Sequence, residues 1–202
     1  PYILGGQERR ILVGSGDDFY ARGDFSANRL NYGIYRRGDP YIDPASGELL
    51  GLRAIDVGAA KVKAVKGDVA TLGATRAAQE IRINDRLLAS EERTLASTFY
   101  PRAPAQSIEA SVISVEDGVR NAGAFDVVGL NRGQREGLQA GDTLAIYKLG
   151  DLTKDRMTGE QIRLPDERIG LVMVFYTYEK MSFALVMEAD RQIDIGDRLV
   201  NP

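Results

Sequence analysis

The sequence of 202 residues contains no cysteine and no histidine. Without cysteine the chain has no disulfide, no thiolate nucleophile and no cysteine-based zinc site. Without histidine it lacks the commonest general base and the commonest ligand of transition metals. It also lacks the Gly-x-Ser-x-Gly motif of serine nucleophiles. These absences favour a protein that is not an enzyme, with no catalytic residue, no metal site and no cofactor.

Charge and hydropathy disfavour two kinds of partner. The net charge of −3 and the pI near 5.2 give no broad positive field, and no cluster of Lys and Arg alternates with aromatic residues, so we expect no nucleic acid. No run of about 18 apolar residues is present, so we expect no transmembrane segment. The chain starts at Pro1 without Met and enters an apolar stretch at once, so we expect further sequence upstream.

The sequence contains an internal duplication. IRINDRLL at 81–88 recurs as IDIGDRLV at 193–200, and IYRRGDPYIDPASGE at 34–48 lies over IYKLGDLTKDRMTGE at 146–160 with the same offset of 112 residues. Counted without gaps from 34–88, 16 of 55 positions are identical. We therefore read the chain as two copies of one module.

The apolar residues alternate with period two, which is typical of strands. Predicted strands include 108–115, 143–147, 169–178 and 181–188, and the dipeptide Gly-Asp, which occurs seven times, supplies tight turns between strands. Gly takes positive φ there, and Asp can bond the backbone two residues on. The prediction is an all-β protein of two tandem small antiparallel β-barrel or sandwich modules.

The duplication also predicts the domain boundaries. Prolines near 101–104 indicate an extended connector, preceded by a turn or two of helix at 90–95. The expected organisation is a first β-module, a connector and a second β-module at residues 1–89, 90–106 and 107–202.

Two short motifs recur in both modules. Ala-Ser-Gly-Glu at 45–48 and Met-Thr-Gly-Glu at 157–160 predict a hairpin turn with Gly in the left-handed region before the next strand. The motif that ends each module predicts one closing strand, with Asn84 in the first copy where the second has Gly196. The acidic runs before the hairpin turns offer too few oxygen ligands for calcium.

The two copies differ on one face of the predicted sheet. In the first copy, alternation places Ala60, Val62 and Ala64 inward and Lys61 and Lys63 outward, because Lys belongs in water. In the second copy Gly170, Val172, Val174 and Tyr176 fall inward, and the outward positions are large and apolar. These outward residues are our candidate interface: Leu171, Met173, Phe175, Met181, Phe183, Leu185 and Met187.

Such a face requires a cover, since burying each large apolar side chain stabilises by roughly 1.5 to 3 kcal/mol. The sequence leaves two ways in which this face could be buried. The first copy, its connector or an unpaired strand of the same chain packs on the face, or the face docks onto a second subunit or another partner.

The second copy resembles a known domain. It carries Gly-Leu-x-x-Gly-Asp-x-Leu-x-Ile-Tyr at 137–147, Ile-Gly-x-x-x-Val at 169–174, Ala-Leu-Val at 184–186 and Ile-Gly-Asp-Arg-Leu-Val near the end. These motifs resemble the carboxy-terminal domain of the flagellar H-ring protein FlgT. With the first copy included, the chain resembles the carboxy-terminal region of the TsaP family, the secretin-associated proteins of type IV pili, whose LysM domain is absent from this sequence.

The resemblance implies a non-catalytic periplasmic protein that associates with an outer-membrane, PilQ-like secretin and, through the LysM domain, with peptidoglycan. It further implies a homo-oligomer around the secretin. Two other classes stay open. A periplasmic module that binds glycan or another polymer predicts a pocket where Tyr20, Tyr32, Tyr35 and Tyr41 converge, and an enzyme acting on the cell wall predicts paired carboxylates in a cleft.

Overall fold

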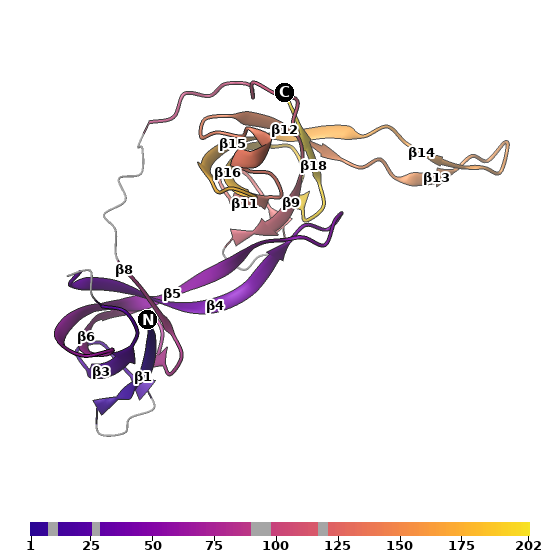
Figure 1. The fold of residues 1–202 in the computed structure, drawn as a ribbon. Coiled ribbons are helices and arrows are strands. Elements are labelled where there is room, and N and C mark those ends of the chain that lie inside the picture. Colours follow the sequence, from indigo (N-terminus) through magenta and orange to yellow (C-terminus); the bar gives the residue numbers. More distant parts are fainter. Residues whose placement is uncertain (8–11, 26–28, 90–97, 117–120) are drawn as a thin grey trace. The chain divides into compact units, whose positions relative to one another are not determined.

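The computed structural model describes residues 1–7, 12–25, 29–89, 98–116 and 121–202 (Figure 1). The chain divides into two compact units. The first comprises Pro1–Asp39 and Leu52–Leu95, and the second comprises Pro40–Gly51 and Ala96–Pro202. The middle of the first sequence copy thus belongs to the second unit. Of the expected connector, residues 90–97, including the expected helical turns, lie outside the described residues.

The first unit contains a closed barrel with the strand order β1-β3-β6-β5-β4-β8. The strands are β1 (Tyr2–Gly6), β3 (Asp18–Arg22), β4 (Asn31–Ile42), β5 (Leu49–Lys66), β6 (Val69–Ala77) and β8 (Arg86–Ala89). A small separate sheet pairs β2 (Leu12–Val13) with β7 (Ile81–Arg82). Large buried side chains such as Phe19, Ile34, Leu72 and Leu87 fill the barrel.

The second unit contains a closed barrel with the order β11-β16-β15-β12-β18-β9. The strands are β9 (Glu109–Val115), β11 (Val127–Leu130), β12 (Thr143–Lys148), β15 (Glu167–Thr177), β16 (Ser182–Ala189) and β18 (Arg198–Val200). Two small sheets accompany it, β10 (Asn121–Ala122) with β17 (Ile193–Asp194) and β13 (Leu152–Lys154) with β14 (Gln161–Arg163). The 3-10 helix η3 (Gln134–Glu136) follows β11.

The two barrels share their strand order and details of their strand pairing, which confirms the predicted all-β fold of duplicated modules. Gly58 pairs with Ala77 as Gly170 pairs with Ala189. The register shifts at the same two places in both copies, after Ala59 and Val62 in β5 and at the corresponding positions of β15. A β-bulge inserts one residue into a strand and changes which face the following side chain occupies.

The second of these bulges corrects two predicted orientations. Ala64 and Tyr176, both predicted inward, lie beyond the bulge, and neither belongs to a barrel core. Ala64 is exposed and Tyr176 is half-buried. Tyr176 pairs with Phe183 in the register. Strict alternation fails here because the extra residue resets the period of the strand.

The closing motif also departs from the prediction of one strand. In each copy it forms two short strands with different partners, β7 and β8 in the first and β17 and β18 in the second. The break follows from a left-handed residue, Asn84 with φ 72° or Gly196 with φ 100°. The next residue, Asp85 or Asp197, accepts the amide N–H three residues earlier at 2.8 Å in both copies. The carboxylate therefore bonds backward, not two residues on as predicted for Gly-Asp.

Gly170 is required because the backbone of β16 leaves no room for a side chain at this position of β15. A Cβ at Gly170 would collide with the carbonyl oxygen of Glu188, and one at Gly58 would collide with that of Arg76. We expect Gly170→Ala to lower the free energy of unfolding of the second unit by about 1 to 3 kcal/mol, because the backbone must shift. Urea denaturation measures the loss. Gly5→Ala is the control, since a Cβ there meets nothing within 4 Å; equal stability of wild type and Gly170→Ala would contradict this pairing.

Candidate interaction surface

Each copy contributes one hairpin arm. We call Pro40–Gly51 the first arm; it lies at the ends of β4 and β5 and belongs to the second unit. The second arm, residues 152–163, occupies the corresponding positions of the second copy and contains β13 and β14. Both turn at a left-handed glycine, Gly47 with φ 72° and Gly159 with φ 79°. The predicted hairpin turn is confirmed.

The turns are held by the same hydrogen bonds in both arms. In the first, the amide of Asp43 donates to the carbonyl oxygen of Glu48 at 2.9 Å, and in the second that of Asp155 donates to the carbonyl oxygen of Glu160 at 2.8 Å. Each aspartate also accepts the amide two residues on with its Oδ1. The arms therefore have the same turn conformation, and only their surroundings differ.

The first arm contacts the outward face of β16 and the turn before it. The rings of Tyr41 and Phe183 meet edge to face with centroids 6.0 Å apart, and the Tyr41 hydroxyl donates to Glu116 Oε1 at 3.1 Å. Gly51 lies so close to Met181 that a Cβ would stand 3.3 Å from its sulfur. For Met181 and Phe183, two of the seven candidates, the cover is therefore a segment of the first copy.

Glu48 anchors the first arm through two cations. Its two carboxylate oxygens accept hydrogen bonds of 2.9 Å from the guanidinium of Arg135, and Lys180 Nζ lies 2.7 Å from Oε1. The hydrogen bonds from Arg135, with those from Lys180, lower the pKa of Glu48 to about 2. The same contact raises the pKa of Arg135 above its ordinary value. Paired, planar contacts of this kind fix orientation as well as distance.

Asp43 forms a second anchor and is buried, with 5% of its surface exposed. Its Oδ1 accepts the amide of Ala45 at 3.0 Å and the side-chain amide of Asn131 at 3.1 Å, and Arg132 lies 3.7 Å from Oδ2. Asn131 in turn accepts the backbone amide of Ser111 at 2.7 Å. Burial alone would raise the pKa of Asp43, but the hydrogen bonds outweigh it and the pKa is lowered.

The seven candidate residues lie outside the core of the second barrel, which is formed by their neighbours Val172, Val174, Ala184 and Val186. Their exposure varies. Met173 and Met181 are buried and Met187 is 36% exposed. The other four are half-buried: Leu171, Phe175, Phe183 and Leu185.

Sequence reasoning missed the arm and its cationic receptor, which consists of Arg132, Arg135 and Lys180. A signal was available. Asp43 and Glu48 both recur in the second copy, at positions where a bare turn needs only its glycine and a polar side chain. The aspartates hold the turn itself, whereas the Glu48 side chain has no role in it, and Glu48 was the residue that indicated a contact elsewhere.

Among the described residues, no such receptor surrounds the second arm. Figure 1 shows β13 and β14 extending away from the second barrel as the orange hairpin. Every residue of both strands is exposed, and Met157 in the turn is 94% exposed. The charged groups of Lys154, Arg156 and Glu160 have no partner among the residues that the structure describes. Leu152 and Ile162 add apolar surface to the same arm.

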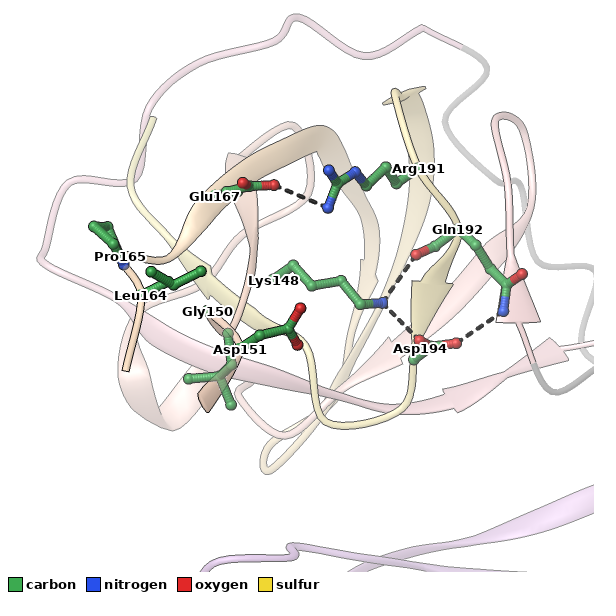
Figure 2. A pocket seen from close by; sticks show the side chains of 10 residues that line it. Lys148, Gly150, Asp151, Leu164, Pro165, Glu167, Arg191, Gln192 and Asp194 are labelled. Atoms are coloured by element: carbon green, nitrogen blue, oxygen red, sulfur yellow. Dashed lines mark hydrogen bonds and ion pairs between the residues drawn. The ribbon is translucent and has the colours of Figure 1, made fainter. Parts of the chain in front are cut away.

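A cavity of about 310 Å³ lies at the base of the second arm (Figure 2). Within it Lys148 Nζ donates to Asp194 Oδ2 at 2.6 Å and to the carbonyl oxygen of Gln192 at 3.1 Å. Arg191 and Glu167 form a second pair at 2.9 Å. Burial opposes the charge of Lys148, but the hydrogen bonds with Asp194 and Asp197 prevail and its pKa is raised.

The Lys148 cluster is part of the scaffold, because the first copy repeats it. Arg36 donates to both oxygens of Asp85 at 2.9 and 2.8 Å and to the carbonyl oxygen of Glu80 at 2.7 Å. These three residues correspond to Lys148, Asp197 and Gln192. Each barrel contains its own copy of this cluster. The cluster therefore stabilises the fold and is not a ligand site that is specific to the second barrel.

None of the four tyrosines of the glycan-binding alternative, Tyr20, Tyr32, Tyr35 and Tyr41, lines the 310 Å³ cavity. Tyr32 is buried against Phe25 in the first core. Tyr41 belongs to the other unit, in the first arm, and Tyr20 is 41% exposed. None of the described residues that line the 310 Å³ cavity is aromatic.

The described ranges are 1–7, 12–25, 29–89, 98–116 and 121–202. There, no three Asp or Glu side chains gather as a metal ion would require. In the same ranges no helix is long and apolar enough to cross a membrane. No family model matches the chain, and no curated protein matches it either.

We expect Glu48→Gln to weaken docking of the first arm in a pH-dependent manner. Because folding lowers the pKa of Glu48 from 4.5 to about 2, its stabilisation is complete above pH 4.5 and is lost as the pH falls toward 2. Urea unfolding of the second unit measures this. The free energy of unfolding of wild type should exceed that of the variant near neutral pH, and the two values should converge in acid. Glu160→Gln, at the same position of the second arm, should show no difference; a gap that does not change with pH would contradict the ion-pair origin.

Proposed function

We propose that this chain is a non-catalytic structural and interaction protein that acts by docking a β-hairpin arm. The supporting observation is the pair of arms. One is anchored by Asp43 and Glu48 within the second unit, and its repeat at 152–163 is exposed. Exposed apolar side chains on a preformed hairpin are typical of a surface that binds another protein.

The arrangement of charges supports a non-catalytic role. Catalytic acids and bases need a poised pKa and access to a substrate. In each barrel the closing aspartate, Asp85 or Asp197, accepts a backbone amide in its turn and pairs with a cation that the other copy repeats. Such groups maintain the fold of each module.

For the partner, we propose the outer-membrane secretin of a type IV pilus machine in the periplasm, with peptidoglycan bound through a LysM domain upstream. The motif resemblance supports this proposal. The outward face of the second barrel supplies a surface of suitable chemistry, since Leu171, Phe175 and Leu185 are half-buried and Met187 is exposed. The corresponding face of the first barrel carries Lys61 and Lys63.

Capture of the secretin from an envelope extract tests this function. We expect Met187→Glu to reduce the captured secretin by about tenfold, because it places a charge in an apolar contact. Thr75→Glu is the matched control, since Thr75 occupies the same position of β6 and is exposed. The thermal unfolding of both variants should equal that of wild type. If wild type captures no secretin, the proposed partner is wrong.

A further inference from the structure

The second arm preserves what the first arm uses for docking. Its turn has the same hydrogen bonds, and Asp155 and Glu160 stand where Asp43 and Glu48 make the anchoring contacts. Around it, however, the described part of the chain supplies no contact to Lys154, Arg156 or the Glu160 carboxylate. A preformed hairpin with unpaired charges and exposed apolar residues is suited to dock elsewhere.

The strand pairing of the two barrels shows which part of the first barrel corresponds to the cationic receptor of the second. Leu130 pairs with Ser182 as Ala21 pairs with Ala70. It follows that Asp68 corresponds to Lys180 and that Gly23 corresponds to Arg132. At this place the first barrel has a cavity of about 440 Å³, lined by Gly23, Asp24, Phe25, Val65, Gly67 and Asp68.

The second arm keeps both carboxylates, as Asp155 and Glu160, but the net charge of the arm and that of its docking place both change sign relative to the first pair. The first arm has two carboxylates and no cation, and its receptor is cationic. The second arm adds Lys154 and Arg156 at its turn, and the cavity on the first barrel presents Asp24 and Asp68. Opposite charges that change in step favour one pairing and disfavour the other.

We propose that the second arm of one molecule docks into this cavity on the first barrel of a second copy of the chain. Lys154 and Arg156 face Asp24 and Asp68, and the apolar residues of the arm cover Phe25 and Val65 at the cavity. Asp68 already pairs with Arg22 at 2.7 Å. The side chains of Arg22 and Asp68 are more than half exposed, so this pair rearranges at little cost. Asp24 also has an interaction of its own, which the cations of the arm would replace.

Two observations disfavour the receptor on the second barrel as the target. That receptor is occupied by the first arm of its own chain. Lys154 and Arg156 would also meet Arg132, Arg135 and Lys180, and like charges brought together oppose docking.

The contact is heterologous, since an arm meets a cavity and not another arm. Each molecule then carries one free arm and one free cavity, and repetition of the contact produces a ring when the rotation closes and a filament when it does not. This inference deepens the proposed assembly function by naming a partner. It is tested with the purified chain alone, so failure to capture a secretin leaves it unaffected.

Sedimentation of the purified chain from micromolar to millimolar concentration is the first test. We expect the average mass to rise with concentration above the 22.1 kDa of one chain. K154E/R156E on the arm, and separately D24K/D68K at the cavity, should each weaken self-association by roughly tenfold or more. E48Q, which alters the other arm, is the control and should leave self-association unchanged.

One mixture and one combined variant separate a broken contact from a damaged fold. The arm variant mixed with the cavity variant should associate again, because the native arm meets the native cavity and the charge-reversed arm meets the charge-reversed cavity. All four substitutions in one chain should restore self-association. The proposal requires a contact between two molecules. A chain that stays monomeric at every concentration therefore overturns it, even if the arm docks within its own molecule. Association that the charge reversals leave unchanged, or that the fourfold variant fails to restore, overturns it as well.

Discussion

Closure of each barrel depends on a buried aspartate that follows a left-handed residue. Asp85 and Asp197 are 3% and 7% exposed, and each is held by a cation from the neighbouring strand, Arg36 or Lys148. A buried carboxylate requires such partners. The turn that it stabilises directs the last strand between the third and the first strand of the barrel in chain order, β8 between β4 and β1 and β18 between β12 and β9, so the ring closes.

On this common scaffold the two copies differ in what they present. The bulges, glycines and closing turns are repeated, while the outward faces and the arms diverge in size and charge. The cations of the second barrel match the carboxylates of the first arm. Scaffold positions are therefore shared between the copies, and positions that differ are the ones available for recognition.

Much of the scaffold could be predicted from sequence. Alternation of apolar residues located most strands. Gly47 and Gly159 identified the arm turns, because few residues other than glycine adopt positive φ. Sequence did not locate the bulge beyond Val62 and Val174, since an extra residue leaves no compositional trace. The destination of the first arm was also hidden: its contacts with Asn131 and Arg135 join residues that are 87 to 88 positions apart in the chain, and periodicity carries no information at that range.

The first arm leaves its own sequence copy to join the second unit. The chain therefore passes between the units three times, once out along the arm, once back and once through the connector. Boundaries drawn from the duplication would place the arm with the first module and separate it from its receptor. An isolated second module would then expose Arg135, Lys180 and the ring of Phe183, and expression of the two repeats as separate proteins would divide a single folding unit.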